Sequence, residues 1–135
     1  MKIVLDTNVL VSGIFFAGPP YEILKAWRDG KINLVISTAI LEEYQRVVEK
    51  LAQEFRGVDV TRILNLLTVS AEIIHAPPLP EPVCSDLEDD KFLACAIAGS
   101  AAYVISGDKQ LLKVSRHGNV KVVNPRWFVE AHLGS

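Results

Sequence analysis

The sequence predicts an α/β fold, a three-layer α/β/α sandwich with a mostly parallel central sheet. Short runs rich in Val, Ile and Leu alternate along the chain with longer stretches of helical periodicity. These runs are too apolar to leave one face in water, which is typical of parallel strands covered by helices on both sides. The length of 135 residues suits one core, so we expect a single domain over residues 1–135.

The expected strands follow one another with helix signals between them. They lie at residues 2–5, 32–36, 72–75, 103–105 and 120–123. Helices are expected at residues 19–29, 37–55, 59–67, 85–98, 109–112 and from 124 to the end, each marked by a cap, an initial Pro or a periodic apolar stripe. After the first strand we expect a loop, in which Thr7 and Asn8 continue a turn. Residues 77–82 are Pro-rich and predict a surface connection.

The charge balance excludes one common way of binding nucleic acid. A net charge of −2 and a pI near 5.9 do not describe a domain coated with positive charge. The segment 109–127 nevertheless contains five basic residues and no acid. It predicts either a phosphate-facing surface or an ordinary solvated one. The basic residues are Lys109, Lys113, Arg116, Lys121 and Arg126.

No apolar run approaches the roughly 20 residues that cross a bilayer, and the first run is too short for the core of a signal peptide. We therefore expect no membrane partner and a cytoplasmic protein. Cys84 and Cys95 form no CxxC pair and have no His close by in the sequence. Two reduced, inert thiols are expected rather than a zinc site or a disulfide.

Two acids follow directly on predicted strands. Asp6 closes the first strand, and Asp108 comes shortly after the strand at 103–105. Sheets of this kind bind ligands beyond the carboxyl ends of their strands, which favours a functional role for both. The structural alternatives are that Asp6 caps a turn and that Asp108 caps a short helix.

Helical spacing brings further acids into question. Glu43 lies three residues after Ile40 and four before Val47, so it is expected to point toward the core. Glu42 is expected on the opposite face, paired with Arg46.

The start of the helix predicted at 85–98 is also acidic, as helix N-termini often are. Asp89 lies one turn before Phe92, whereas Asp90 aligns with Leu93. Spacing does not choose between the two acids.

Carboxylates gathered at one edge of a sheet repel one another and require a cation. An all-oxygen set selects a hard ion, Mg²⁺ or Mn²⁺, rather than zinc. Such an ion can activate water for attack on phosphorus and neutralise charge on the leaving oxygen. The predicted chemistry is phosphodiester hydrolysis.

Four segments together resemble the motifs of the PIN-domain family, in its order and spacing. They are residues 5–10 (LDTNVL), Glu43–Tyr44, residues 89–93 (DDKFL) and residues 106–112 (SGDKQLL). The chain is most similar to the VapC-like toxins of toxin–antitoxin pairs. The resemblance implies a Mg²⁺- or Mn²⁺-dependent endoribonuclease, an RNA substrate, a homodimer and inhibition by an antitoxin.

The resemblance also implies roles for individual residues. The catalytic acids are Asp6, Glu43, Asp89 and Asp108, and the metal ligands among them are Asp6, Asp89 and Asp108. The supporting polar groups are Asn8 and Ser106. Asp90 ranks second to Asp89, and Asp86 is a further candidate that acts through a second metal or a water. The basic segment 109–127, rather than the resemblance, predicts the substrate contacts at Lys109, Lys113 and Arg116.

Two other functions fit parts of this pattern. A phospho-accepting receiver domain also gathers Asp residues beyond strand ends, but it needs an acidic pair after its first strand, where this chain has Thr7 and Asn8 after a single Asp. A catalytically inert PIN fold that binds RNA or protein is the second alternative. The presence of all four acids argues against it.

Overall fold

The computed structural model describes residues 1–134 and contains one six-stranded sheet. The strands stand in the order β3-β2-β1-β4-β6-β5, and every neighbouring pair is parallel except β5 with β6. The mostly parallel sheet predicted from the sequence is confirmed. The strands are β1 (Lys2–Leu5), β2 (Asn33–Ser37), β3 (Glu72–Ile74), β4 (Tyr103–Ile105), β5 (Arg116–His117) and β6 (Val120–Val123).

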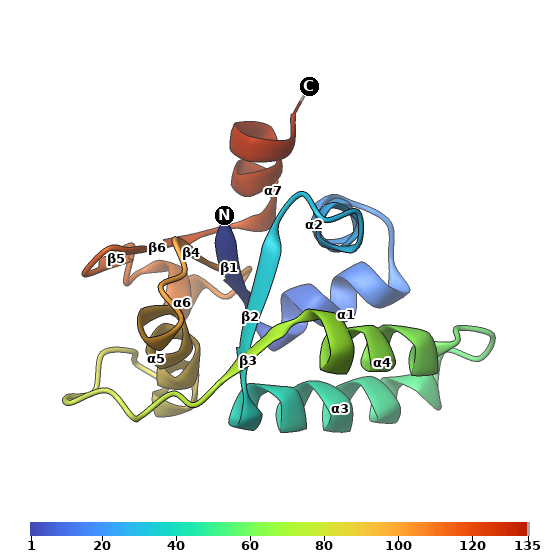
Figure 1. Ribbon diagram of the computed structural model, residues 1–135, viewed down its shortest axis with the longest axis horizontal. Coiled ribbons are helices and arrows are strands. Elements are labelled where there is room, and N and C mark those ends of the chain that lie inside the picture. The colour runs from blue at the N-terminus through green and yellow to red at the C-terminus, as the bar shows by residue number, and fades with distance from the viewer. Residues whose placement is uncertain (135) are drawn as a thin grey trace.

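Helices cover both faces of this sheet, as Figure 1 shows. The chain runs from β1 through β2 to β3 in one direction and then returns to β4 on the other side of β1. Because crossovers between parallel strands are right-handed, the reversal moves the later helices to the opposite face. The helices are α1 (Thr7–Phe15), α2 (Pro19–Arg28), α3 (Thr38–Ala52), α4 (Val60–Ser70), the 3₁₀ turn η1 (Leu87–Asp89), α5 (Asp90–Ala98), α6 (Lys109–Leu112), α7 (Pro125–Phe128) and the π-helical turn η2 (Val129–Leu133).

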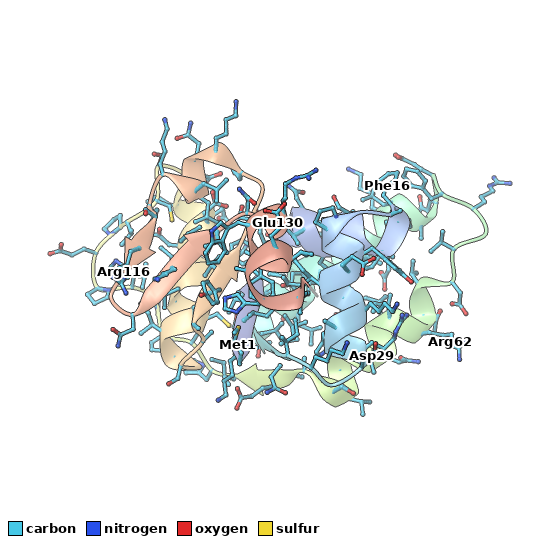
Figure 2. All side chains as sticks on the ribbon, turned by 90° about the horizontal axis from the view of Figure 1, so that it is seen from above. Met1, Phe16, Asp29, Arg62, Arg116 and Glu130 are labelled. Atoms are coloured by element: carbon cyan, nitrogen blue, oxygen red, sulfur yellow. The ribbon has the colours of Figure 1, made fainter. Side chains whose placement is uncertain are left out.

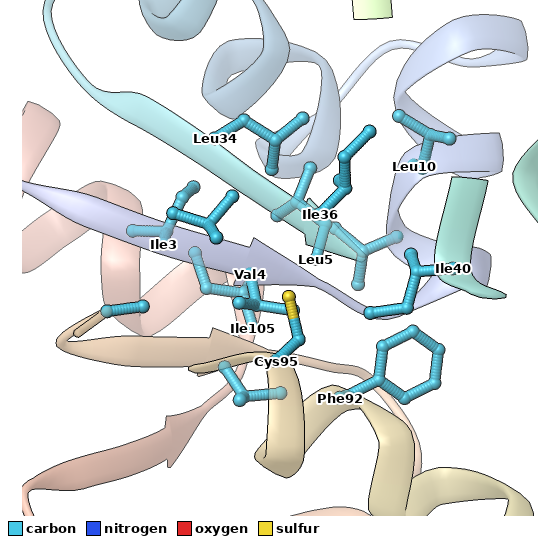
Figure 3. Close-up of a cluster of buried hydrophobic side chains, with 14 of the residues drawn as sticks. Ile3, Val4, Leu5, Leu10, Leu34, Ile36, Ile40, Phe92, Cys95 and Ile105 are labelled. Carbon is cyan, nitrogen blue, oxygen red and sulfur yellow. The ribbon is translucent and has the colours of Figure 1, made fainter. Parts of the chain in front are cut away.

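The core lies along β1 and β2, whose apolar side chains are buried on both faces. Leu10 of α1 and Phe92 of α5 approach the strands from opposite sides (Figure 3). Val4 at the centre of β1 has no exposed surface. This packing explains why the strands read as continuous apolar runs rather than as alternating ones.

The prediction of a loop after the first strand is wrong, because the helix α1 begins at Thr7. Asp6 caps this helix, and the buried Val9 and Leu10 hold it against the core. The sequence prediction also missed the β5–β6 hairpin. Its two-residue loop is Gly118-Asn119, with Gly118 at a φ of 60°, a conformation that suits glycine.

The helix predicted over residues 85–98 is divided in two. Asp86, rather than Ser85, caps the 3₁₀ turn η1, with its carboxylate accepting a hydrogen bond from the Glu88 amide at 3.0 Å. The α-helix proper, α5, starts only at Asp90. None of the helices in residues 1–134 has the length and apolar character needed to cross a membrane.

Candidate active site

The junction between β1 and β4 is the point at which the chain reverses direction across the sheet. The Asp6 amide donates to the Ile105 carbonyl at 3.0 Å, so the carboxyl ends of the two strands are joined. The connections that leave such a pair of strands diverge, and the crevice between them is the usual ligand site of an open α/β sheet. Asp6 and Asp108 both follow strands of this pair.

Asp6 is held firmly at the end of β1. Its side chain is buried, with 5% of its surface exposed. Ser106 donates its hydroxyl to Oδ2 at 2.5 Å, and the Asn8 amide donates to Oδ1 at 3.2 Å. Burial raises the pKa of Asp6, the two hydrogen bonds lower it, and the nearby charges of Asp108 and Glu43 raise it again, so the net direction is upward.

Ser106 joins the two acids. It is fully buried, and its oxygen accepts a hydrogen bond from the Asp108 amide at 3.0 Å while its hydroxyl is donated to Asp6. Asp108 also caps α6, accepting from the Gln110 amide at 2.8 Å. Asp6 and Asp108 therefore both cap helices, as the structural alternatives predicted. The same two residues are also linked to each other through Ser106.

Asp89, at the end of η1, belongs to the same electrostatic neighbourhood. Burial, followed by the negative charges of Asp6, Asp108 and Asp86, raises the pKa of Asp89 from 3.8 to about 6. Its Oδ2 atom is buried and has no hydrogen-bond partner within residues 1–134. The charges of Asp6 and Asp108, which come from two other segments of the chain, thus act on Asp89, and we call Asp6, Asp89 and Asp108 the acid cluster.

Asp90 differs from Asp89 in its hydrogen bonds, although helical spacing could not distinguish the two residues. Its two oxygens accept hydrogen bonds from the Cys84 amide at 2.7 Å and the Val83 amide at 3.2 Å. Burial acts to raise the pKa of Asp90, but these hydrogen bonds outweigh it and hold the pKa below its ordinary value. Asp90 ties the preceding segment to the start of α5.

Asp86 stands at the margin of the cluster. Its side chain is exposed and caps η1, so it is engaged with the backbone. Its charge nevertheless acts on Asp89, since it contributes to the raised pKa of that residue.

Glu43 is partly buried, as its position on the helix predicted, and it is already neutralised. Lys91 and the Thr7 hydroxyl each donate a short hydrogen bond to it, one to each carboxylate oxygen. Burial acts to raise the pKa of Glu43, but Lys91 and Thr7 outweigh it and the pKa is lowered. Arg46 lies 3.9 Å from Glu43, so the expected pairing of Arg46 with Glu42 is wrong.

Sequence reasoning did not identify Lys91 or Thr7 as site residues. Lys91 lies 3.4 Å from Glu88, three residues earlier, and its charge also lowers the pKa of Asp89. The available signal was its position directly after the acidic run of residues 86–90, as the first basic residue of that segment.

The predicted substrate contacts are divided by the fold. Lys109 opens α6 directly beside Asp108, and Lys113 ends that helix. In the sheet, Arg116 of β5 lies opposite Lys121 of β6, which in turn lies opposite the first residue of β4. It therefore lies toward the amino-terminal end of the strands, at the margin of the molecule (Figure 2), and the structure does not bring it to the acid cluster.

Comparison with known proteins agrees with this geometry. The family model described as PIN domain matches residues 2–110. The chain belongs to the PIN-domain family. PIN domains are in general nucleases, which are hydrolases of nucleic acids. This family membership displaces the receiver-domain alternative.

A solved structure supports the PIN fold independently. The crystal structure of PAE2754 from Pyrobaculum aerophilum is 15% identical in sequence and superposes with a TM-score of 0.62. The match covers 100% of this chain and 91% of the other. No curated protein sequence matches the chain significantly.

The donors of this PIN domain are suited to a hard cation. No three acidic, His or Cys side chains of residues 1–134 already stand in a metal-binding arrangement. The acid cluster nevertheless supplies only oxygen ligands, and Asp89 Oδ2 has no protein hydrogen bond to lose when it turns toward an ion. Burial is the largest cause that raises the pKa of Asp6 and Asp89, and repulsion from neighbouring acids raises it further. A bound divalent cation would offset both effects, because it favours the charged form of each carboxylate.

The two cysteines have no part in the site. Both are free and buried. Burial is the largest cause that raises the pKa of Cys84 and of Cys95, each to about 12. At neutral pH both are thiols and poor nucleophiles, in agreement with the inert thiols predicted from the sequence.

Proposed function

We propose that this PIN domain is a metal-dependent endoribonuclease that hydrolyses RNA phosphodiester bonds. The observation that supports the proposal is that Asp89, whose buried Oδ2 has no hydrogen-bond partner within residues 1–134, feels the charges of Asp6 and Asp108, which follow the neighbouring strands β1 and β4. Like charges that are partly buried near one another destabilise the folded protein, and such groups with shifted pKa values are often found at functional sites.

The acid cluster would hold Mg²⁺ or Mn²⁺ through carboxylate oxygens. When bound, the ion supplies a nucleophile at neutral pH and neutralises charge that develops on the phosphate. Ser106 and the Asn8 backbone fix the orientation of Asp6, and the Gln110 amide fixes that of Asp108. Two of the three ligands are therefore oriented before an ion arrives, which lowers the entropic cost of binding it.

Glu43 acts in this proposal through Lys91. Their ion pair is largely shielded, with 19% and 22% of the two side chains exposed. Glu43 holds the Lys91 ammonium group near Asp89, where it offsets negative charge and is available to a phosphate oxygen. Lys109 is placed to contact a neighbouring phosphate, and Lys113 lies one turn further along. Asp86 acts on a water or a second ion at the margin.

Three further statements rest on the resemblance of the sequence to VapC-like toxins. They are inhibition by an antitoxin protein, assembly as a homodimer and a cytoplasmic location. The inert binding module is the competing function, and the presence of every acid of the cluster argues against it.

The test is cleavage of labelled single-stranded and hairpin RNAs by the Asp6→Asn variant, with Mn²⁺ or Mg²⁺ and with EDTA. We expect activity only with the ions and a loss on the order of 100-fold or more in the variant, because several kcal/mol of charge stabilisation disappear. Asp59→Asn is the matched control, since Asp59 caps α4 in the same way at an exposed site.

A folded Asp6→Asn protein that cleaves at the parental rate refutes the assignment. Parental protein that binds RNA but cleaves none of it at any concentration of either ion supports the inert module instead.

A further inference from the structure

A cavity of about 600 Å³ opens beside the acid cluster and has no part in the mechanism so far. It is enclosed by the start of α3, the end of β3, the Pro-rich segment 77–82 and the start of α5. In Figure 1 these are the lower ends of β2 and β3 and the loop that passes below α5. A cavity of this size is typical of small-molecule sites in proteins.

The cavity is lined in part by residues next to Asp89 in the chain. Lys91 lines the cavity and at the same time binds Glu43, while Glu88 and Asp90, the neighbours of Asp89, also line it. A group inside the cavity thus contacts residues that flank Asp89 in the chain. A strand of RNA with its phosphate at the acid cluster can reach the cavity with an adjacent nucleotide.

The lining has the character that a nucleobase needs. Ile74, Leu79 and the exposed Leu87 provide apolar surface. The Thr38 hydroxyl and the His75 ring lie on the same lining and can bond to base edges. Apolar faces with a few polar groups at their margin are how proteins hold unpaired bases.

The charge of the protein also favours recognition of the bases of RNA. With 14 basic and 16 acidic residues, and with Arg116 at the far end of the strands, phosphate contacts alone cannot supply strong binding of RNA. Affinity must then come in large part from the bases. A paired and stacked base cannot enter a cavity, so a site of this kind selects single-stranded RNA.

We propose that this cavity binds one unpaired nucleobase of the RNA, next to the phosphate that is cleaved, and so sets a preference for single strands and for particular bases. The inference rests on the proposed ribonuclease function. It names the part of the substrate that the same site recognises.

The experiment records amide chemical shifts of the ¹⁵N-labelled protein in EDTA, where no cleavage occurs, during titration with trinucleotide RNAs and with a duplex of matching sequence. We expect the trinucleotides to shift the amides of Thr38, His75, Leu79 and Leu87, and the duplex to leave these amides unchanged. Base preference in binding should match base preference in Mn²⁺-dependent cleavage.

Ala39→Trp places a large side chain in the cavity from an exposed position. It should weaken trinucleotide binding about tenfold, the value of one lost base contact. Ala98→Trp, at an exposed position outside the cavity, is the matched control and should bind as the parent does.

Shifts confined to the acid cluster, equal shifts with the duplex, or unaltered binding by Ala39→Trp would each overturn the base-binding proposal. In any of these cases, retained Mn²⁺-dependent cleavage would leave the nuclease assignment intact. Shifts at the cavity without cleavage would support the base site and refute the nuclease.

Discussion

Replacing Asp89 with Asn should make the metal-free protein more stable at neutral pH, although it removes a proposed metal ligand. Asp89 is the member of the acid cluster with no hydrogen bond at Oδ2, and its pKa is raised by burial and then by the charges of Asp6 and Asp108. In the absence of an ion its negative charge opposes folding. An amide in the same place has no charge and can donate to a neighbouring carboxylate.

The size of the effect follows from the shift. The pKa of Asp89 rises from 3.8 to about 6, and about 1.4 kcal/mol per pH unit makes this about 3 kcal/mol at most. Partial exposure of the residue lets solvent screen the charge, so the expected gain in the free energy of unfolding is about 1–2 kcal/mol. Because the folded pKa is the higher one, Asp89 favours folding below pH 3.8 and loses that contribution as pH rises through about 6.

The assay is urea unfolding of parent and variant in EDTA at about pH 4 and about pH 7.5. We expect nearly equal stability at the lower pH and the full gain at the higher one. Asp90→Asn is the matched control with the opposite sign. Its carboxylate accepts two backbone hydrogen bonds and has a lowered pKa, so its loss should destabilise the protein near neutral pH.

Mn²⁺ completes the test. At a concentration of about 100 times Kd it should stabilise the parent by about 2.7 kcal/mol and the Asp89→Asn variant far less. If Asp89→Asn loses stability in EDTA near neutral pH, or gains as much from Mn²⁺ as the parent, the reasoning about a repelling metal-binding cluster is refuted.

Three further outcomes are expected. Lys91→Met should destabilise the protein by about 1–3 kcal/mol in urea unfolding, because it leaves the partly buried Glu43 without its cation. Combining Lys91→Met with Glu43→Gln should recover much of this loss, and an equal loss of stability in the single and double variants would contradict the reasoning. Ser106→Ala removes the hydroxyl that orients the carboxylate after β1, so calorimetry should show Mn²⁺ affinity lower by about 10–100-fold, whereas unchanged affinity would remove Ser106 from the site. Cys84 and Cys95 should resist alkylation by iodoacetamide in the folded protein, because burial is the largest cause that raises the pKa of each to about 12. Both should react in urea, and mass spectrometry can measure the difference. Rapid alkylation of either thiol in the folded protein would contradict this.

Local signals in the sequence determined much of the fold. The β1 run, the Asp59 cap, the Asp108 cap and the Asn124-Pro125 helix start were all predicted, and all are present. Each depends on residues within one helical turn or one strand, where capping and periodicity act. The missed start of α1 shows the limit. Thr7-Asn8 has the local character of a turn, and it becomes helix because buried residues further along α1 pack on the core.

For the site as well, some features were predicted from the sequence and others appeared only in the tertiary structure. The sequence by itself determined which acids were candidates, since strand ends and helical faces identified Asp6, Asp108 and Glu43. Only the tertiary structure distinguished the surroundings of Asp89 from those of Asp90, because the hydrogen bonds that occupy Asp90 come from a loop whose path no spacing predicts. It alone also brought Lys91 to Glu43, 48 residues away. Capping and periodicity act within a turn or a strand, whereas contacts between distant charges exist only after the sheet has brought their segments together.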